Sequence, residues 1–280
     1  MQKKGSFEYE TRSDTKGLAD SILQVKKVFD EHDLFFWISY GGLLGIIRDG
    51  ELIPWNNDLE AGCWYSDISD DQITKIVDRL NNIGFTCIFY KSFGTINIKK
   101  GPLVDININF YWIENEKVIR PHETASKYEG KNFLASVFYW TSAFIFIYPN
   151  SFKKFKFRNK NELLNLKNIF KFFISQIFKI LPFNIRRKVF ELLISISEKL
   201  GGKFQKTAMP LKYFENFELY PFNGSQIYIP SNPEKLLKFL YGNDWKIPKD
   251  KWRFYDEQNK KNTSVEFINE KFDYSKLNLK

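Results

Sequence analysis

The spacing of apolar residues at the start of the chain predicts a helix, a strand and a second, shorter helix. Between Lys16 and His32 apolar side chains recur every three or four positions, as on an amphipathic helix. The nearly continuous apolar run 35–40 predicts a strand that delivers the glycine pair Gly41-Gly42 in a turn at its end. Residues 43–47 then predict a short helix, and Arg48-Asp49-Gly50 is its terminating turn.

The pattern from residue 58 to residue 110 predicts one helix among several strands. Asp58 to Glu60 suits an extended strand, and Ser69 to Ile83 predicts a helix with Ser69 as its N-cap. Two strands are expected at 85–90 and 94–99. A strict alternation follows from Leu103 to Phe110, which predicts a strand with Asp105, Asn107 and Asn109 on one face and apolar side chains on the other.

The second half of the chain is less regular. Its most apolar window, 133–148, is too short to span a bilayer, and its β-branched and aromatic content favours buried strands. The basic segment 163–200, broken at Leu181-Pro182, predicts a helical hairpin. Two interpretations of this hairpin stay open: a cover over the active site, or an interfacial helix that touches a membrane. The charged tail is expected to be peripheral.

Composition narrows the class of protein. The chain has 280 residues, of which 43% are hydrophobic and 18% aromatic, so it is globular and forms one large domain or two small ones. A net charge of +9 predicts an anionic partner: nucleic acid, an acidic membrane surface or a nucleotide-activated substrate. Two cysteines exclude a disulfide framework and a cysteine-rich zinc site. The first residues lack the apolar core of a signal peptide, so a cytoplasmic protein is expected.

Candidate chemistry lies between Gly41 and Asp105. Asp58 and Glu60 are two positions apart on a predicted strand, so both carboxylates point the same way and could hold one Mg²⁺ beside a phosphate. Asp105 is expected to be the third wall of the site, either sharing the metal or accepting the proton of an attacking hydroxyl. A lone Asp-x-Glu on a strand is usually solvated surface, but its surroundings here favour a functional role.

Three further residues are candidates for donor phosphate. Gly41 and Gly42 have no Cβ to obstruct the approach of phosphate oxygens to the backbone. Arg48 could clamp a phosphate, or could only tie the helix end to Asp49 or Glu51.

Two blocks of sequence resemble the LicD/fukutin family. The first is YGGLLGIIRDGELIPWNNDLE, which resembles the family signature of a small-residue turn, LLG, an Arg, a polar-Gly pair, IPW and an acidic cluster. The second runs from Pro221 to Trp252 and resembles the C-terminal block, a strand ending in Ile-Pro followed by a helix ending in Leu-x-x-x-Tyr-Gly-x-x-Trp. Between them, Val104 to Ile106 resembles the third acidic position.

The resemblance implies an α+β fold, a nucleotidyltransferase-like mixed β-sheet flanked by helices, with a helical insertion. It implies one catalytic domain over 1–280, with the nucleotidyltransferase-like core at 16–112, the insertion at 161–202, the C-terminal family block at 207–252 and a peripheral tail at 253–280. It also implies transfer of a substituted phosphate, such as phosphocholine or ribitol phosphate, from a CDP-linked donor to a glycan hydroxyl. Bacterial family members decorate lipooligosaccharide, capsule or teichoic acid.

The implied cofactor is Mg²⁺, with Mn²⁺ as a substitute, held by Asp58, Glu60 and Asp105. The partners implied are a CDP-linked donor and a glycan or lipid-linked glycan acceptor, with peripheral contact at the inner membrane face and no nucleic acid. The chain departs from the family where Asn56 and Asn57 stand in place of acids and Glu60 in place of the usual Asp. Alternatives are a template-independent nucleotidyltransferase and a basic nucleic-acid-binding protein.

Overall fold

The computed structural model describes residues 15–54, 56, 58–90, 94–101, 103–122, 134–135, 137–138, 141, 180–200, 204–248 and 263–270. The chain consists of two compact units. The first comprises Met1–Pro121, Lys206–Ile268 and Ser275–Lys280, and the second comprises His122–Gln205 and Asn269–Tyr274. The candidate residues for chemistry all belong to the first unit.

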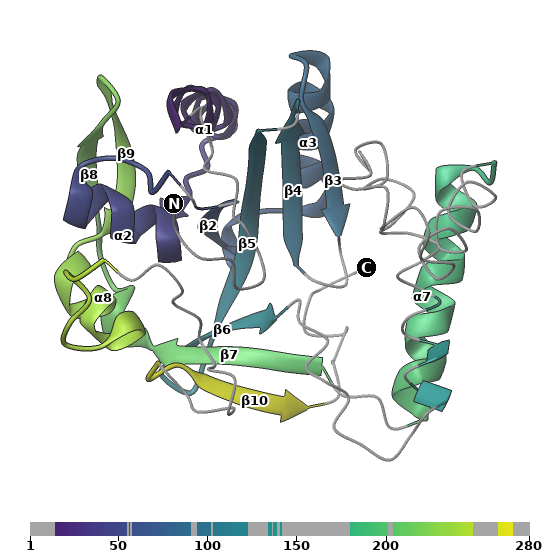
Figure 1. The fold of residues 1–280 in the computed structure, drawn as a ribbon. Helices are drawn as coiled ribbons and strands as arrows, with labels where there is room; N and C mark the ends of the chain where they lie inside the picture. The colour runs from purple at the N-terminus through teal and green to yellow at the C-terminus, as the bar shows by residue number, and fades with distance from the viewer. Residues whose placement is uncertain are drawn as a thin grey trace, which may run out of the picture. The chain divides into compact units, whose positions relative to one another are not determined.

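The first unit is built on a mixed β-sheet with helices, as expected (Figure 1). In the described residues the strand order is β10-β7-β6-β5-β2-β1-β9-β8, while β4 pairs with β5 and β3 with β4. Parallel pairs (β2 with β5, β1 with β9) occur beside antiparallel ones. The strands are β1 (Trp37–Ile38), β2 (Leu59–Trp64), β3 (Thr86–Tyr90), β4 (Thr95–Lys100), β5 (Val104–Glu114), β6 (Lys117–His122), β7 (Phe204–Pro210), β8 (Phe217–Phe222), β9 (Ser225–Pro230) and β10 (Glu266–Glu270).

Four helices of this unit are α1 (Thr15–Asp30), α2 (Tyr40–Asp49), α3 (Asp70–Asn82) and α8 (Pro233–Tyr241), with short 3₁₀ turns at Tyr65–Asp67 and Leu211–Tyr213. Helix α3 begins as predicted. The Ser69 side chain accepts a hydrogen bond from the backbone N–H of Gln72, and the Gln72 side chain accepts one from the backbone N–H of Ser69. The two bonds form a capping box. Helix α2 ends at Asp49 and is capped by Gly50, whose φ of 77° is left-handed.

The predicted glycine turn is wrong. Strand β1 stops at Ile38, and Gly41 and Gly42 lie in the first turn of α2. A Cβ on Gly42 would lie 2.5 Å from Leu59 Cδ1, and one on Gly45 would lie 2.5 Å from the Glu51 carbonyl oxygen. The glycines therefore let the helix pack tightly against β2 and the loop before it, and this close packing outweighs their weak helix propensity.

The core of the first unit lies under the apolar face of the central strands. Leu59, Ala61, Ile96, Ile98, Ile106 and Ile108 are at most 1% exposed. Both cysteines are free and buried, and burial raises the pKa of Cys87 to about 12, so its thiol stays protonated at neutral pH.

In the second unit, helix α7 (Phe183–Lys199) begins directly after Pro182, where the sequence predicted a break. The first half of the predicted hairpin, 163–179, lies outside the described residues, so the hairpin stays a prediction. In the apolar window 133–148 the described residues are helical, so the strand prediction is wrong there. In a short apolar run, the periodicity of the sequence does not distinguish a strand from a buried helix. No described helix is both long enough and apolar enough to cross a membrane.

Candidate functional site

The pairing of three strands places the predicted carboxylates on one face of the sheet. Strand β2 runs parallel to β5 with Glu60 opposite Asn107, and β4 runs antiparallel to β5 with Lys99 opposite Asp105. Because side chains alternate along each strand, one face collects polar groups while the other forms the core. The polar face carries Asp58 and Glu60 beside β5, Asp105, Asn107 and Asn109 on β5, and Thr95, Asn97 and Lys99 on β4.

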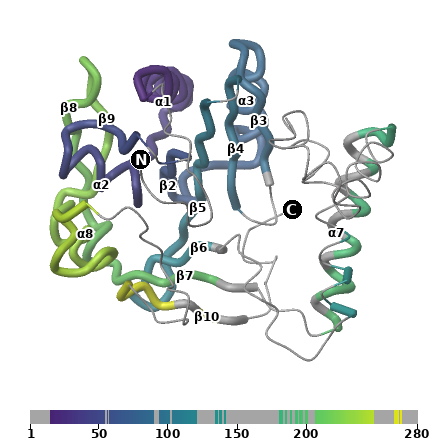
Figure 2. The backbone as a smooth tube through the Cα atoms, in the orientation of Figure 1, coloured from purple at the N-terminus to yellow at the C-terminus, as the bar shows by residue number. Residues whose placement is uncertain are grey.

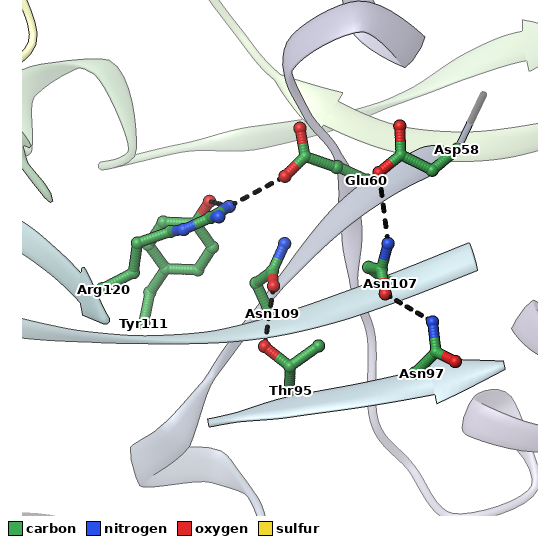
Figure 3. A network of polar contacts seen from close by, with 8 residues as sticks. All are labelled: Asp58, Glu60, Thr95, Asn97, Asn107, Asn109, Tyr111 and Arg120. Atoms are coloured by element: carbon green, nitrogen blue, oxygen red, sulfur yellow. Dashed lines mark hydrogen bonds and ion pairs between the residues drawn. The ribbon is translucent and has the colours of Figure 1, made fainter. Parts of the chain in front are cut away.

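A chain of hydrogen bonds connects two of the three carboxylates. Asn97 Nδ2 donates to Asp105 Oδ1 at 2.9 Å and to Asn107 Oδ1 at 2.7 Å. Asn107 Nδ2 in turn donates to Asp58 Oδ2 at 3.3 Å (Figure 3). The side-chain amides of Asn97 and Asn107 thus orient the carboxylates of Asp105 and Asp58. Strands β4 and β5 and the residue just before β2 therefore contribute to one site.

Glu60 has a different partner, a buried arginine. Arg120 Nη1 lies 3.1 Å from Glu60 Oε1 and 3.4 Å from the Tyr111 hydroxyl oxygen. The guanidinium also lies against two aromatic rings, 5.2 Å from the centroid of Tyr40 and 5.9 Å from that of Tyr111. Burial alone would lower the pKa of Arg120, but Tyr111, Tyr40 and Glu60 raise it well above its usual value, so the residue is charged.

The start of helix α2 lies at the same edge of the sheet. Strand β1 is antiparallel to β2, so its end leads the chain to the beginning of β2, and the Ser39 amide donates to the Glu60 carbonyl oxygen at 3.0 Å. Tyr40 begins the helix with a φ of 46°, an unusual value for a residue with a bulky side chain. Such strain occurs preferentially at functional sites. Burial raises the pKa of the Tyr40 hydroxyl well above its usual value.

Two buried polar atoms on this face have no hydrogen-bond partner within the described residues. They are Ser39 Oγ, at the N-cap of α2, and Asn109 Nδ2, on β5. Asn109 Oδ1 does accept a hydrogen bond from Thr95 Oγ1 at 2.9 Å. In Figure 3 the Asn109 nitrogen points toward the same side of the sheet as the Glu60 carboxylate. Buried donors left open in this way are unusual and call for a ligand or water.

Of the two roles considered for Arg48, the structure shows the contact with the helix end and not an open phosphate clamp. Its guanidinium makes two hydrogen bonds with the adjacent Asp49, with Nε to Oδ1 at 2.8 Å and Nη2 to Oδ2 at 2.6 Å. The Arg48 side chain is only 8% exposed. A role in binding phosphate would require this fork to open.

The C-terminal block reaches the site through α8. Helix α8 packs against α2, and Figure 2 shows the two helices next to each other although they are far apart in sequence. The Tyr241 side chain is buried; burial raises its pKa, and the negative charge of Glu60 raises it further while Arg48 lowers it. The two blocks that carry the family resemblance thus lie together in space.

The donor set fits a hard divalent cation in chemistry, since carboxylate oxygens are the ligands that Mg²⁺ prefers. Two of the three carboxylates already have cationic partners, because Lys99 Nζ lies 3.0 Å from Asp105 Oδ2 and Arg120 holds Glu60. Among the described residues no three His, Cys, Asp or Glu side chains gather closely enough to ligate a metal. The three-carboxylate metal set therefore stays a prediction.

Sequence reasoning missed Arg120, Asn97 and Tyr111. Asn97 could have been found, because it alternates with apolar residues in the segment TINIKK just as Asn107 does in β5. Arg120 carries no local signal, since its role depends on strand β6 pairing with β5 through Trp112 and Ile119. Trp55 and Asn57, which were part of the first motif, lie outside the described residues.

Comparison with known proteins adds little to this geometry. No family model matches the chain. A stretch of 94 residues is 30% identical to an uncharacterized protein of Rickettsia prowazekii (strain Madrid E) and covers 31% of this chain. The chain spans about a third of that relative, 33% of its length.

Two solved structures of the antibiotic-resistance factor ANT(2'')-Ia align over 66% of the chain. The solution structure aligns with a TM-score of 0.30, 14% identity and 93% of its own length covered. The crystal structure in complex with adenylyl-2''-tobramycin gives a TM-score of 0.29, 13% identity and 98%. TM-scores this low do not define a common fold.

Proposed function

We propose that the chain is a Mg²⁺-dependent transferase that moves a substituted phosphate from a CDP-activated donor to a hydroxyl of a bacterial cell-surface glycan. The observation that carries the proposal is the polar face of the sheet, where Asp58, just before β2, and Glu60, on β2, lie near Asp105 on the parallel strand β5. The start of α2 lies at the same edge. Carboxylates next to a helix N-terminus form a site for a cation and a phosphate together. The LicD/fukutin resemblance of the two sequence blocks supports the choice of donor and acceptor.

In this proposal Asp58, Glu60 and Asp105 hold Mg²⁺, and Mn²⁺ would replace it. When bound, the cation neutralises charge on the phosphate that is transferred. Asn97 and Asn107 keep Asp58 and Asp105 oriented toward the same side of the sheet.

The donor phosphates would bind at the start of α2. The first-turn amides of a helix lack intrahelical acceptors and carry the positive end of the helix dipole, so they attract phosphate oxygens. Gly41 and Gly42 lie in this turn, and the Ser39 hydroxyl is a further donor at its edge. Arg48 would add a positive charge if its contact with Asp49 opened.

The reaction itself needs one proton acceptor. The acceptor hydroxyl attacks the phosphorus next to the transferred alcohol, the bond from that phosphorus to CMP breaks, and CMP leaves with the bonding electron pair. Asp105 would accept the hydroxyl proton as the alternative to sharing the metal, and its position on the polar face, with 30% of its side chain exposed, supports this role.

A lipid-linked acceptor would place the protein at the inner face of the membrane, in contact through the basic segment 163–200. In the described part of that segment, α7 exposes Ile185 and Leu192. Flotation with anionic liposomes at low salt tests this contact. A protein that stays at the bottom of the gradient would exclude it.

The proposed reaction is tested by incubating the protein with Mg²⁺ and a panel of CDP-alcohols, CTP and ATP, and by measuring CMP and pyrophosphate. We expect CMP from a CDP-alcohol in the presence of an acceptor glycan. Pyrophosphate from a nucleoside triphosphate would instead identify a template-independent nucleotidyltransferase. Neither product, together with tight and salt-sensitive binding of RNA or DNA, would indicate a nucleic-acid-binding protein.

A further inference from the structure

The pair of Arg120 and Glu60 combines a buried cation with a more accessible anion. The Arg120 side chain is 8% exposed and the Glu60 side chain 26%. Only one oxygen of Glu60 is involved, since Arg120 Nη1 contacts Oε1. Figure 3 shows the Glu60 and Asp58 carboxylates pointing to the same side of the sheet, while Arg120, on β6, contacts Glu60.

A cation bound between Asp58 and Glu60 would compete directly with Arg120. Two carboxylates two positions apart in the chain that point the same way repel each other, and a cation next to one of them lowers that repulsion. Arg120 supplies such a charge inside the protein. A divalent cation that binds the same carboxylates takes over this role and competes with the guanidinium for the Glu60 carboxylate.

The surroundings of Arg120 favour an anion as its next partner. The Tyr40 and Tyr111 rings lie beside the guanidinium, so they hold it in position while providing no negative charge. A guanidinium has five N–H donors in a planar fork that matches phosphate oxygens. Asn109 Nδ2 is a second buried donor on the same face with no partner in the described part of the chain.

We propose that Arg120 is a phosphate-binding residue of this site, held by Glu60 until a divalent cation takes that carboxylate. The cation and the phosphate of the donor thus bind as a charge-balanced set, with Arg120 passing from Glu60 to the phosphate. The inference rests on the proposed function, because it assumes that the carboxylates bind a divalent cation. It adds a residue from β6 that no sequence motif contains.

The test measures two affinities in the variant Arg120→Met. Mn²⁺ binding is followed by electron paramagnetic resonance of the free ion, and CDP binding by calorimetry in saturating Mn²⁺. Removing the competing positive charge should tighten Mn²⁺ binding by about threefold or more. Removing the phosphate ligand should weaken CDP binding by about tenfold or more. If Arg120 had only a structural role, its loss would weaken the binding of both Mn²⁺ and CDP. Tighter Mn²⁺ binding together with weaker CDP binding therefore distinguishes the proposed role from a structural one.

Two further variants serve as controls. Arg120→Lys keeps the buried charge but not the fork, so Mn²⁺ affinity should stay within about twofold while CDP binding weakens by about threefold or more. This variant decides the matter if Arg120→Met does not fold. Arg79→Met removes the arginine of an exposed pair with Glu31, 47% and 36% exposed, and should change neither affinity.

The outcomes separate the two proposals. Unchanged or weaker Mn²⁺ binding in Arg120→Met, or undiminished CDP binding in Arg120→Lys, overturns the role of Arg120 alone. Absence of Mn²⁺ binding in the unaltered protein overturns the metal site of the proposed function, and the exchange at Glu60 with it.

Discussion

Asp58→Asn will reduce the proposed transfer of a phospho-alcohol by about a thousandfold or more while leaving the fold intact. The substitution removes one of the negative charges that would hold the divalent cation, and such a cation contributes several kcal/mol to stabilising charge on a transferred phosphate. The fold should tolerate the change, because the side chain is only partly buried and the asparagine carbonyl oxygen can still accept the hydrogen bond from Asn107. The measurements are the rate of CMP release and the midpoint of thermal unfolding.

Asp78→Asn is the matched control for this variant. Asp78 lies on the exposed side of α3, and the same loss of one negative charge there should change neither rate nor unfolding midpoint. Turnover by Asp58→Asn at the rate of the unaltered protein would refute the metal assignment. A fall of the same size in both variants would point to net charge instead of the site.

Glu60→Ala will destabilise the protein by about 3 kcal/mol, because it removes the carboxylate that the buried Arg120 guanidinium contacts. The pair is asymmetric: Arg120 is 8% exposed and has little access to water, whereas Glu60 is 26% exposed. The double variant Glu60→Ala, Arg120→Met should regain most of the loss, since it removes the buried guanidinium together with its carboxylate. Urea unfolding followed by circular dichroism gives the free energies of unfolding for the complete double-mutant cycle.

An exposed glutamate in a similar pair provides the comparison. Glu31 receives a hydrogen bond from Arg79 at 3.1 Å, but both side chains are open to solvent. Glu31→Ala should therefore cost much less than Glu60→Ala, because solvent screens an exposed ion pair. If Glu60→Ala costs no more than Glu31→Ala, or if the double variant recovers nothing, Arg120 is not a buried charge that depends on Glu60.

The sequence predicted best where one short segment contains the whole physical reason. Helix α3 was predicted from the N-cap residue Ser69 and from Asp70 and Asp71 in the first turn. This was possible because an N-cap acts within a single helical turn. Strand β5 was predicted from its alternation, and the face that carries Asp105, Asn107 and Asn109 is the polar one. In both cases neighbouring residues determine the structure without help from distant parts of the chain.

The prediction failed where packing between distant residues decides the structure. Gly41-Gly42 looked like a turn, but close approach of α2 to Leu59 makes the pair helical. Arg120 could not be found, because it becomes part of the site only when β6 returns alongside β5. The candidate residues come together because of the register in which the strands pair. That register involves distant parts of the chain, so no local sequence pattern specifies it.

The central claim is that the polar face between β2 and β5 binds a divalent cation together with a phosphate. The most direct test is a crystal structure grown with Mn²⁺ and CDP, with diffraction data collected at the manganese absorption edge. The account predicts an anomalous peak in contact with Asp58 and at least one of Glu60 and Asp105, with the CDP phosphates between that peak and the first turn of α2. Bound CDP with no anomalous peak at these carboxylates, or a manganese ion elsewhere in the protein, would contradict it.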